Sequence, residues 1–180
     1  MDTAKSVVIT GASTGIGAAC ALHLDQLGWR VFAGVRKQAD AEALRAQGSP
    51  RLTPISLDVT DAVSISTAAG AVAGAVGAAG LTGLVNNAGI VVPGPIEFLP
   101  LADLRRQLEI NVVGQVAVTQ AFLPLIRAGR GRIVNMGSIA GRMATPFTGA
   151  YGASKFALEA LTDALRLELA PWGISVSIIE

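Results

Sequence analysis

The chain has 180 residues, enough for one domain with a sizeable core and too few for a second large domain. Its 14 basic and 13 acidic residues give a net charge of +1, which argues against the broad positive field that nucleic-acid or anionic-membrane binding needs. The single cysteine, Cys20, allows no internal disulfide, and the first ten residues do not resemble a secretory signal. We therefore expect a cytoplasmic protein.

Short runs rich in branched residues alternate with longer segments of helical pattern along the whole chain. The expected strands are Val7–Thr10, Val31–Val35, Leu52–Leu57, Gly83–Asn86, Arg132–Met136 and Ser175–Ile179. The expected helices are Gly15–Leu27, Ala39–Gln47, Asp61–Ala79, Leu101–Ala128 and Ala150–Ala170. Because the strands look buried on both faces and alternate with helices, the pattern predicts an α/β fold with a doubly wound parallel sheet.

One long stretch, residues 62–96, carries no charge at all. Its apolar residues are mostly Ala and Gly, whereas a membrane-spanning helix needs about 20 strongly apolar residues. We expect no membrane span, and predict a buried helix followed by a buried strand. Gly70, Gly74 and Gly77 fall on one face of this helix, where each glycine costs about 1 kcal/mol relative to alanine. We attribute them to the close approach of a neighbouring backbone, with a loose helix as the alternative.

The first expected strand ends in a glycine-rich turn, and a helical pattern follows at once. Gly11 can adopt a backbone angle that other residues avoid, Gly15 lets the chain approach a pyrophosphate closely, and Gly17 lets the helix pack tightly on the strand. The start of that helix would present free amides to the phosphates. Because no Lys-Ser or Lys-Thr pair follows the glycines, the turn predicts a dinucleotide rather than ATP with magnesium. An ordinary strand-to-helix turn that needs glycine is the alternative.

Further polar motifs follow this turn along the chain. They are Asn86-Asn87-Ala88-Gly89, Asn111, Ser138 and Tyr151-x-x-x-Lys155. With the glycine spacing, their order resembles the short-chain dehydrogenase/reductase family, in its short single-domain branch of hydroxysteroid- and retinol-dehydrogenase-like enzymes. The resemblance implies a Rossmann fold in which residues 1–180 form one dinucleotide-binding and catalytic domain. It also implies an NAD(P)-dependent oxidoreductase that interconverts an alcohol and a ketone or aldehyde.

The family resemblance also concerns the end of the chain. Similar enzymes continue with a substrate lid and a seventh strand. We therefore expect the domain to be truncated after the sixth strand and the 180-residue piece to have poor activity.

The resemblance assigns Tyr151 as the catalytic acid/base. A free tyrosine has a pKa of about 10, too high for ready proton exchange at neutral pH. Lys155 lies one helical turn later, and its ammonium, with the positive nicotinamide, would favour the phenolate. Without the other motifs, a surface tyrosine beside a solvated lysine would be the preferred interpretation.

In similar enzymes two further polar residues complete the catalytic set. Ser138, after the fifth expected strand, would hold the substrate oxygen; the alternative is a serine that caps a loop. Asn111 would disturb its helix locally and hold a water that links the lysine to solvent; the alternative is a tolerated polar position.

The resemblance places the cofactor along the carboxyl ends of the strands. Asp58 would accept a hydrogen bond from the adenine amino group, with Val59 against the ring and the segment 87–89 beside the adenine ribose. The expected cofactor-binding residues are Gly11, Ser13, Thr14, Gly15, Ile16, Gly17, Arg36, Asp58, Val59, Asn87, Ala88, Gly89, Tyr151 and Lys155.

The choice between NADP and NAD depends on the end of the second strand. An NAD-selective site usually places a carboxylate here, but Val35 occupies this position and Arg36 follows it. A guanidinium can hold a phosphate with two parallel hydrogen bonds, so NADP is favoured. NAD stays open, since the glycine turn has no basic residue and some relatives with a neutral residue here use NAD.

Apolar residues in the segments 137–148 and 92–94 favour an apolar small-molecule substrate. We expect no metal site, because no Cys, His and carboxylate cluster occurs, and we interpret His23 as an ordinary helix residue. The resemblance implies a homodimer or homotetramer formed by the helices Leu101–Ala128 and Ala150–Ala170. Two other functions stay open: a nucleotide-binding sensor or scaffold without turnover, and an epimerase or dehydratase, which shares the Tyr-x-x-x-Lys pair.

Overall fold

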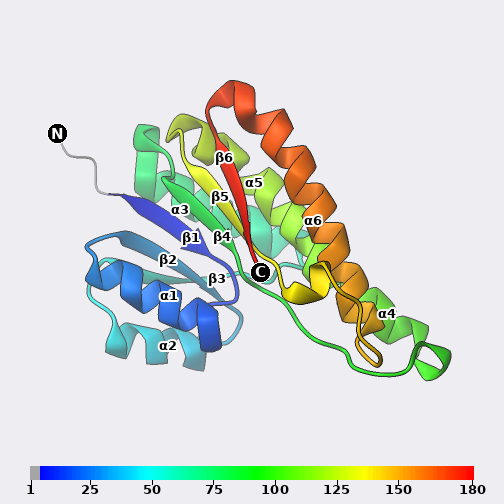
Figure 1. Ribbon diagram of the computed structural model, residues 1–180. Helices are drawn as coiled ribbons and strands as arrows, with labels where there is room; N and C mark the ends of the chain where they lie inside the picture. Colours follow the sequence, from blue (N-terminus) through cyan, green and yellow to red (C-terminus); the bar gives the residue numbers. More distant parts are fainter. Residues whose placement is uncertain (1–4) are drawn as a thin grey trace.

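The computed structural model describes residues 5–180 (Figure 1). Residues 1–4, which belong to the expected domain and to the segment judged unlike a signal, lie outside the described residues. Six strands form one sheet in the order β3-β2-β1-β4-β5-β6, and each neighbouring pair is parallel. The strands are β1 (Ser6–Ile9), β2 (Arg30–Val35), β3 (Leu52–Ser56), β4 (Gly83–Asn86), β5 (Arg132–Met136) and β6 (Ser175–Ile179).

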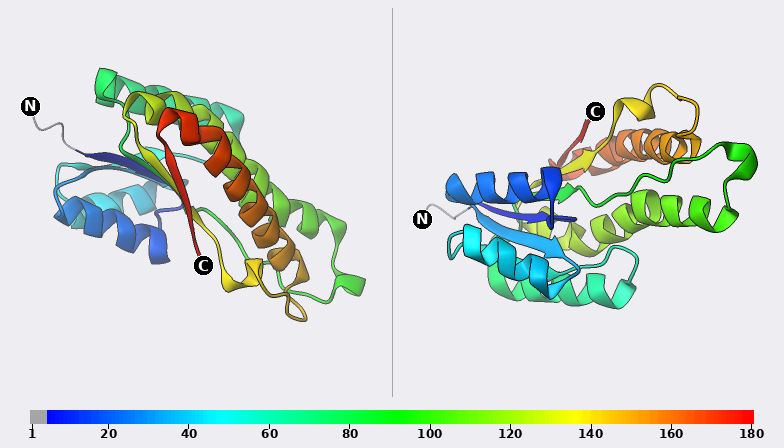
Figure 2. Two further views of the ribbon diagram at one scale, coloured as in Figure 1. Left: turned by 45° about the horizontal axis from the view of Figure 1, so that its top comes forward. Right: turned by 90° about the horizontal axis from the view of Figure 1, so that it is seen from below.

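Helices cover both faces of this sheet. They are α1 (Gly15–Gln26), α2 (Gln38–Gln47), α3 (Ala62–Val76), α4 (Leu101–Leu108), α5 (Gly114–Ala128) and α6 (Gly149–Leu169). The buried apolar residues form two clusters, one between the sheet and α1 with α2, the other between the sheet and α3, α5 and α6. Figure 2 shows these two groups of helices on opposite faces of the sheet. Successive residues of β1 belong to different clusters, Val7 to the first and Val8 to the second, as the alternation of side chains along a strand requires. The doubly wound α/β fold is therefore confirmed.

The expected helix Leu101–Ala128 is continuous but changes its winding in the middle. Residues Glu109–Val113 form a π-helical segment between α4 and α5. Such a segment carries one extra residue in the turn, and it commonly occurs at functional sites. Asn111 lies inside it, so the local disturbance that the family resemblance implied at this position is present.

The interpretation of the α3 glycines as points of close backbone approach is wrong. No heavy atom lies within 4 Å of a Cβ built on Gly70, Gly74 or Gly77. The helix is also less buried than expected, with Ile65, Ala68 and Val72 as its buried residues. Much of its apolar character comes from Ala and Gly, which expose little apolar surface when they face solvent.

Two helical segments of the described chain, Ala62–Ala79 and Leu101–Ala128, have the length and composition that could cross a membrane. Core helices pass the same test, and both segments contribute buried residues to the cluster on one face of the sheet. Their composition is therefore weak evidence for a membrane span.

The carboxyl ends of β1, β2, β3 and β4 meet at one edge of the sheet, because all strands run parallel. Ligands of open α/β sheets bind at this edge, near the point where the strand order reverses. Here the order reverses between β1 and β4, which are neighbours although two strands separate them in the sequence. The fold thus places the glycine turn after β1 directly beside the Asn-Asn-Ala-Gly segment after β4.

Candidate active site

The turn between β1 and α1 needs glycine at each of its three glycine positions. Gly11 has a φ of 63°, and a Cβ there would lie 2.8 Å from the Cα of Ala88. Gly15 has a φ of 57° and faces open space. A Cβ on Gly17 would overlap the carbonyl of Gly11 and the side-chain amide of Asn87. The turn, the ligand-facing space and the tight helix packing expected from the sequence are therefore all present.

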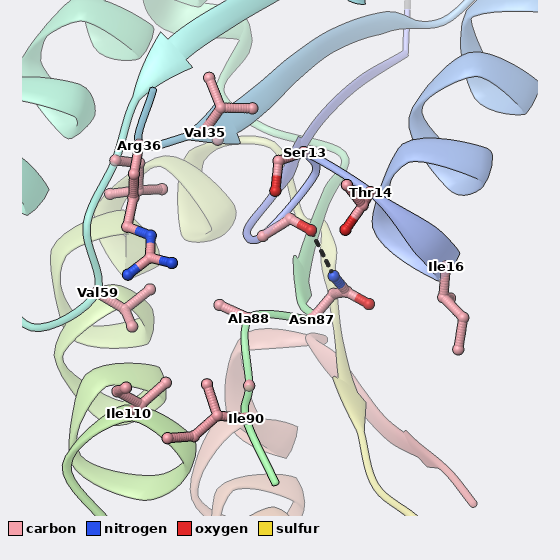
Figure 3. A pocket seen from close by; sticks show the side chains of 14 residues that line it. Ser13, Thr14, Ile16, Val35, Arg36, Val59, Asn87, Ala88, Ile90 and Ile110 are labelled. Carbon is pink, nitrogen blue, oxygen red and sulfur yellow. Dashed lines mark hydrogen bonds between the residues drawn. The ribbon is translucent and has the colours of Figure 1, made fainter. Parts of the chain in front are cut away.

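Hydrogen bonds join this turn to the segment after β4. The Thr10 hydroxyl accepts from the backbone amides of Asn87 and Ala88, at 2.9 Å each. The side-chain amide of Asn87 donates to the carbonyls of Thr10 and Gly11, at 3.0 Å each, and Figure 3 shows it reaching toward the turn. Thr10 was not among the predicted site residues, although a hydroxyl residue directly before the first glycine was a visible signal.

A pocket of about 370 Å³ opens beside the turn (Figure 3). In the close-up, Ser13 and Thr14 lie on the side of the turn, while Arg36 and Val59 lie on the side of β2 and the loop after β3. Nine of the expected cofactor-binding residues line it: Gly11, Ser13, Thr14, Ile16, Arg36, Val59, Asn87, Ala88 and Gly89. The lining also includes Gly34, Val35, Leu57, Ile90 and Ile110, which the sequence analysis did not assign.

Five expected cofactor-binding residues lie outside the lining of this pocket: Gly15, Gly17, Asp58, Tyr151 and Lys155. Asp58 is half-buried next to it and accepts hydrogen bonds from the amide and hydroxyl of Thr60, at 2.9 and 2.7 Å. Burial acts to raise the pKa of Asp58, but the Thr60 hydrogen bonds and the charge of Arg36 outweigh it, so the pKa lies below its ordinary value. Asp58 is therefore an acceptor at neutral pH.

A dinucleotide fits the shape and chemistry of the turn. The side chain of Thr14, the N-cap of α1, makes no capping hydrogen bond, whereas Asp61 at the start of α3 accepts from the amides of Val63 and Ser64. The first amides of α1 are therefore left to an external acceptor, and the helix dipole favours an anionic one. The open space at Gly15 would admit such a group without steric conflict.

Tyr151 and Lys155 lie one turn apart on α6, and the lysine Nζ is 5.6 Å from the centre of the tyrosine ring. The ammonium donates to the carbonyl of Met136, the last residue of β5, at 2.5 Å. Lys155 is buried, and this burial lowers its pKa from 10.5 to about 8. The alternative of a solvated surface lysine is therefore wrong.

Ser138 follows β5 at the same end of the sheet. It is half-buried, and its hydroxyl oxygen accepts from the amide of Ala140 at 3.1 Å, which makes it the cap of the 3₁₀ turn Ile139–Gly141. The alternative interpretation of Ser138, a serine that caps a loop, is therefore confirmed. It does not oppose a role toward a ligand, because a hydroxyl has a second lone pair and a proton to donate.

Asn111 connects the segment after β4 to the helix that carries Tyr151. Its side-chain oxygen accepts from the amide of Ile90 at 2.8 Å, and its amide donates to the Ile90 carbonyl at 2.9 Å. The same amide donates to the hydroxyl of Ser154 at 3.1 Å, which in turn donates to the Tyr151 carbonyl at 2.6 Å. Asn111 is completely buried, so the alternative of a tolerated polar position is wrong.

Two buried glutamines on the same helix, like Asn111, hydrogen-bond the backbone of the segment after β4. Gln107 accepts from the amide of Val92 and donates to the Ile90 carbonyl, both at 2.7 Å. Gln115 donates to the Ala88 carbonyl at 3.2 Å. The sequence analysis missed both, although the spacing of four residues between Gln107, Asn111 and Gln115 places them on one helix face.

Comparison with known proteins defines the class. The family model described as short chain dehydrogenase matches residues 5–180, so the chain belongs to the short-chain dehydrogenase family. Mouse retinol dehydrogenase 5 is 45% identical over 175 residues, which cover 97% of this chain and 55% of the relative. Human 17-beta-hydroxysteroid dehydrogenase type 6 is 46% identical over 177 residues, which cover 98% of this chain and 56% of the relative.

A solved structure agrees with this assignment. A short-chain dehydrogenase from Streptomyces avermitilis matches with a TM-score of 0.91 and 36% identity, and the match covers 100% of this chain and 66% of that one. The family model and this solved structure therefore agree on the short-chain dehydrogenase family for this chain. The chain spans about half the length of the named relatives.

Proposed function

We propose that the protein interconverts an apolar alcohol and its ketone or aldehyde, with NAD(P) as cofactor and Tyr151 as the acid/base. The observation that carries this proposal is the pair on α6: a tyrosine beside a buried lysine whose ammonium is held at the carboxyl end of β5. A structural helix has no need of a buried charge at this place, since burial without an anionic partner is costly.

Each of the site residues has its own role in the proposed reaction. A nicotinamide cofactor held at the glycine turn would supply the hydride-transfer chemistry. In the oxidation direction the Tyr151 oxygen takes the proton of the alcohol, and in the reduction direction it returns a proton to the carbonyl oxygen. The Ser138 hydroxyl donates a hydrogen bond to that same oxygen. Lys155 places a positive charge beside the phenol, and at neutral pH it keeps that charge because its pKa is about 8.

Exposed apolar side chains near the site support an apolar substrate. Phe147 and Met143 project from the loop before α6, and Val91 and Ile96 from the segment after β4. The amide of Gly94 donates to the Phe147 carbonyl at 2.7 Å, so the two segments lie side by side. Relatives named as retinol and hydroxysteroid dehydrogenases are enzymes of apolar alcohols, which agrees with this proposal.

The direct test is a cofactor-oxidation assay of the protein with apolar ketones and aldehydes, repeated with Tyr151→Phe. We expect turnover in the wild type, slow for the 180-residue chain, and a further loss of at least about 100-fold in the variant, because general acid–base catalysis contributes about 10²–10⁴-fold. Cofactor binding, followed by nucleotide fluorescence, should remain, since Tyr151 lies outside the pocket at the glycine turn. Cofactor binding without turnover in the wild type would instead favour the sensor or scaffold function.

We propose NADP as the preferred cofactor. Arg36 lines the pocket at the end of β2, and its guanidinium lies on the side of the pocket opposite Ser13 and Thr14 (Figure 3). No carboxylate is present among the residues that line the pocket to repel a 2′-phosphate. The Michaelis constants for the two cofactors test this, with NADPH expected to have the lower one. A lower constant for NADH would overturn the preference.

A further inference from the structure

The structure contains a buried acidic residue close to the site for which the proposed reaction has no use. Glu159 lies on α6 one turn after Lys155, with only 6% of its surface exposed. Its Oε2 atom is 3.0 Å from Nη2 of Arg142. Its Oε1 atom is buried and has no hydrogen-bond partner among the described residues. The buried carboxylate is therefore held by one ion pair with Arg142, whose own side chain is 55% exposed.

Arg142 comes directly after the 3₁₀ turn Ile139–Gly141, which Ser138 caps. Besides Glu159, its guanidinium contacts Oε1 of Glu180, with Nη2 at 2.8 Å and Nε donating at 2.9 Å. Arg142 therefore connects this turn to α6 and to the residue after β6. All three views show the end of β6 beside the turn (Figures 1 and 2).

The turn itself fits tightly on α6. A Cβ on Gly141 would lie 3.1 Å from the Lys155 carbonyl and 3.2 Å from Oε1 of Glu159. A Cβ on Gly152, one turn before Lys155 and two turns before Glu159 on the helix, would lie 3.5 Å from the Ala140 carbonyl. The turn thus rests on the helix between Tyr151 and Glu159, and Ser138 is hydrogen-bonded to this same turn.

Net stability is a poor explanation of this ion pair. Burial raises the pKa of Glu159, the charge of Arg142 lowers it, and the charge of Glu180 raises it again. The Arg142 side chain is 55% exposed, and an ion pair with an exposed partner typically contributes about 1 kcal/mol or less, so the pair adds little stability. It does, however, restrict geometry, because the same guanidinium contacts Glu159 on α6 and Glu180 after β6.

We propose that Arg142 and Glu159 are positioning residues for the proposed reaction. Their ion pair holds the turn 139–141 on α6 and thereby sets the position of the Ser138 hydroxyl relative to the Tyr151 phenol. Neither residue touches the reacting atoms. The inference rests on the proposed function, since its kinetic consequence requires turnover, but the position of the turn can also be measured without it.

The test compares Arg142→Gln, Glu159→Gln and the double variant with the wild-type protein. We expect each single variant to lower kcat about 10- to 100-fold, because small misplacements of reacting groups cost about that much. The cofactor dissociation constant should stay within about twofold, since the pocket at the glycine turn is formed by other residues. The double variant should lose no more than the worse single variant, as expected for two members of one interaction.

Two matched variants serve as controls. Arg142→Lys keeps one charged donor and should give a kcat between those of the wild type and Arg142→Gln. Asp163→Asn removes another acidic residue of α6 that pairs with its own arginine, Arg166, and should leave kcat unchanged. Amide hydrogen exchange provides a second measurement: the amides of Gly141, Arg142 and Met143, which bond within the turn, should exchange faster in both Gln variants.

Unchanged kcat and unchanged amide exchange in the two Gln variants would overturn the inference. A loss of kcat in Asp163→Asn equal to that in the Gln variants would also overturn it. If the wild-type protein shows no turnover, the proposed function fails, and the exchange rates of the turn alone decide the inference. Slower catalysis together with an equally weakened cofactor affinity would indicate general loss of structure and would also overturn it.

Discussion

Lys155 is the residue whose chemical state depends most on its surroundings. It is 5% exposed, and its ammonium donates to a backbone carbonyl rather than to a carboxylate. A carbonyl replaces only part of the hydration that the ammonium loses, so burial lowers its pKa to about 8. The folded protein therefore carries a cation at neutral pH that costs stability, and this cost has a predictable dependence on pH.

We predict that the wild type gains stability relative to Lys155→Met as the pH rises from about 8 to 10.5. In this range the unfolded chain holds the proton on Lys155 and the folded chain has released it, so the free energy of unfolding increases with pH. Below pH 8 both states are charged and the difference is constant. One pH unit between the two pKa values corresponds to about 1.4 kcal/mol, which gives a total rise of about 3 kcal/mol.

Urea denaturation of both proteins at a series of pH values measures this difference. Subtracting the Lys155→Met values removes the contributions of the other titrating groups, which the two proteins share. A difference that is flat or falls between pH 8 and 10.5 would contradict the burial of the charged amine.

At this scale, the sequence was most informative where a residue type is unusual for its position. Asn111 could be recognised in that way, whereas Tyr151 and Lys155 were assigned from the family resemblance. The structure brings the three into one connected region. Glu159 could not, because a glutamate on a helix is ordinary until its burial is known. The partners of such residues depend on which backbone groups come to lie beside them.

Two helices contain glycine for different reasons. On α1, Gly17 is buried, and a Cβ there would meet the carbonyl of Gly11 and the amide of Asn87. On α3, Gly74 is exposed, and nothing lies within 4 Å of a Cβ there. The sequence analysis treated both as contact positions, since glycine spacing alone does not reveal what a helix face meets.

We predict opposite effects of alanine at these two positions. Gly74→Ala should raise the free energy of unfolding by about 1 kcal/mol, because alanine has the higher helix propensity and no contact is lost. Gly17→Ala should lower it by about 1–3 kcal/mol through overpacking, and it should weaken nucleotide binding because the turn must move. Gly77→Ala is a further control: its φ of 55° disfavours alanine, so it should not stabilise.

Chemical denaturation and nucleotide titration measure both effects. A destabilising Gly74→Ala would mean that another surface covers this face of α3, contrary to the exposure seen here. An unchanged nucleotide affinity in Gly17→Ala would remove the glycine turn from the binding site.

For the whole molecule, the alternation of elements was enough to predict the sheet and the edge that carries the site. It was not enough to predict the side-chain hydrogen bonds that join the sheet to the helices. Asn86 and Asn135 are paired neighbours on β4 and β5, and the Asn86 amide donates to Asn135 and to Thr119 of α5 at 2.9 Å each. Asn135 donates to Thr162 of α6 at 2.9 Å. Such a network depends on strand register, which a continuous buried run does not reveal.

The exposed apolar side chains also indicate how copies of the protein associate. The outer layer formed by α4, α5, the π-helical segment between them and α6 exposes large apolar side chains. The exposed fraction is 51% for Val113, 45% for Phe156 and 77% for Leu167. Exposed apolar groups on adjacent helices are typical of association surfaces. We predict that these helices mediate a homodimer or part of a homotetramer.

Replacing Leu167 with Glu should therefore shift the protein toward a single chain in sedimentation velocity at micromolar concentration, because a charge would be buried without a partner across the interface. Leu27→Glu is the matched control, since Leu27 is 61% exposed at the end of α1, in the opposite layer. It should leave the sedimentation coefficient unchanged. A wild type that sediments as one chain, or an equal effect of the two substitutions, would refute assembly through this layer.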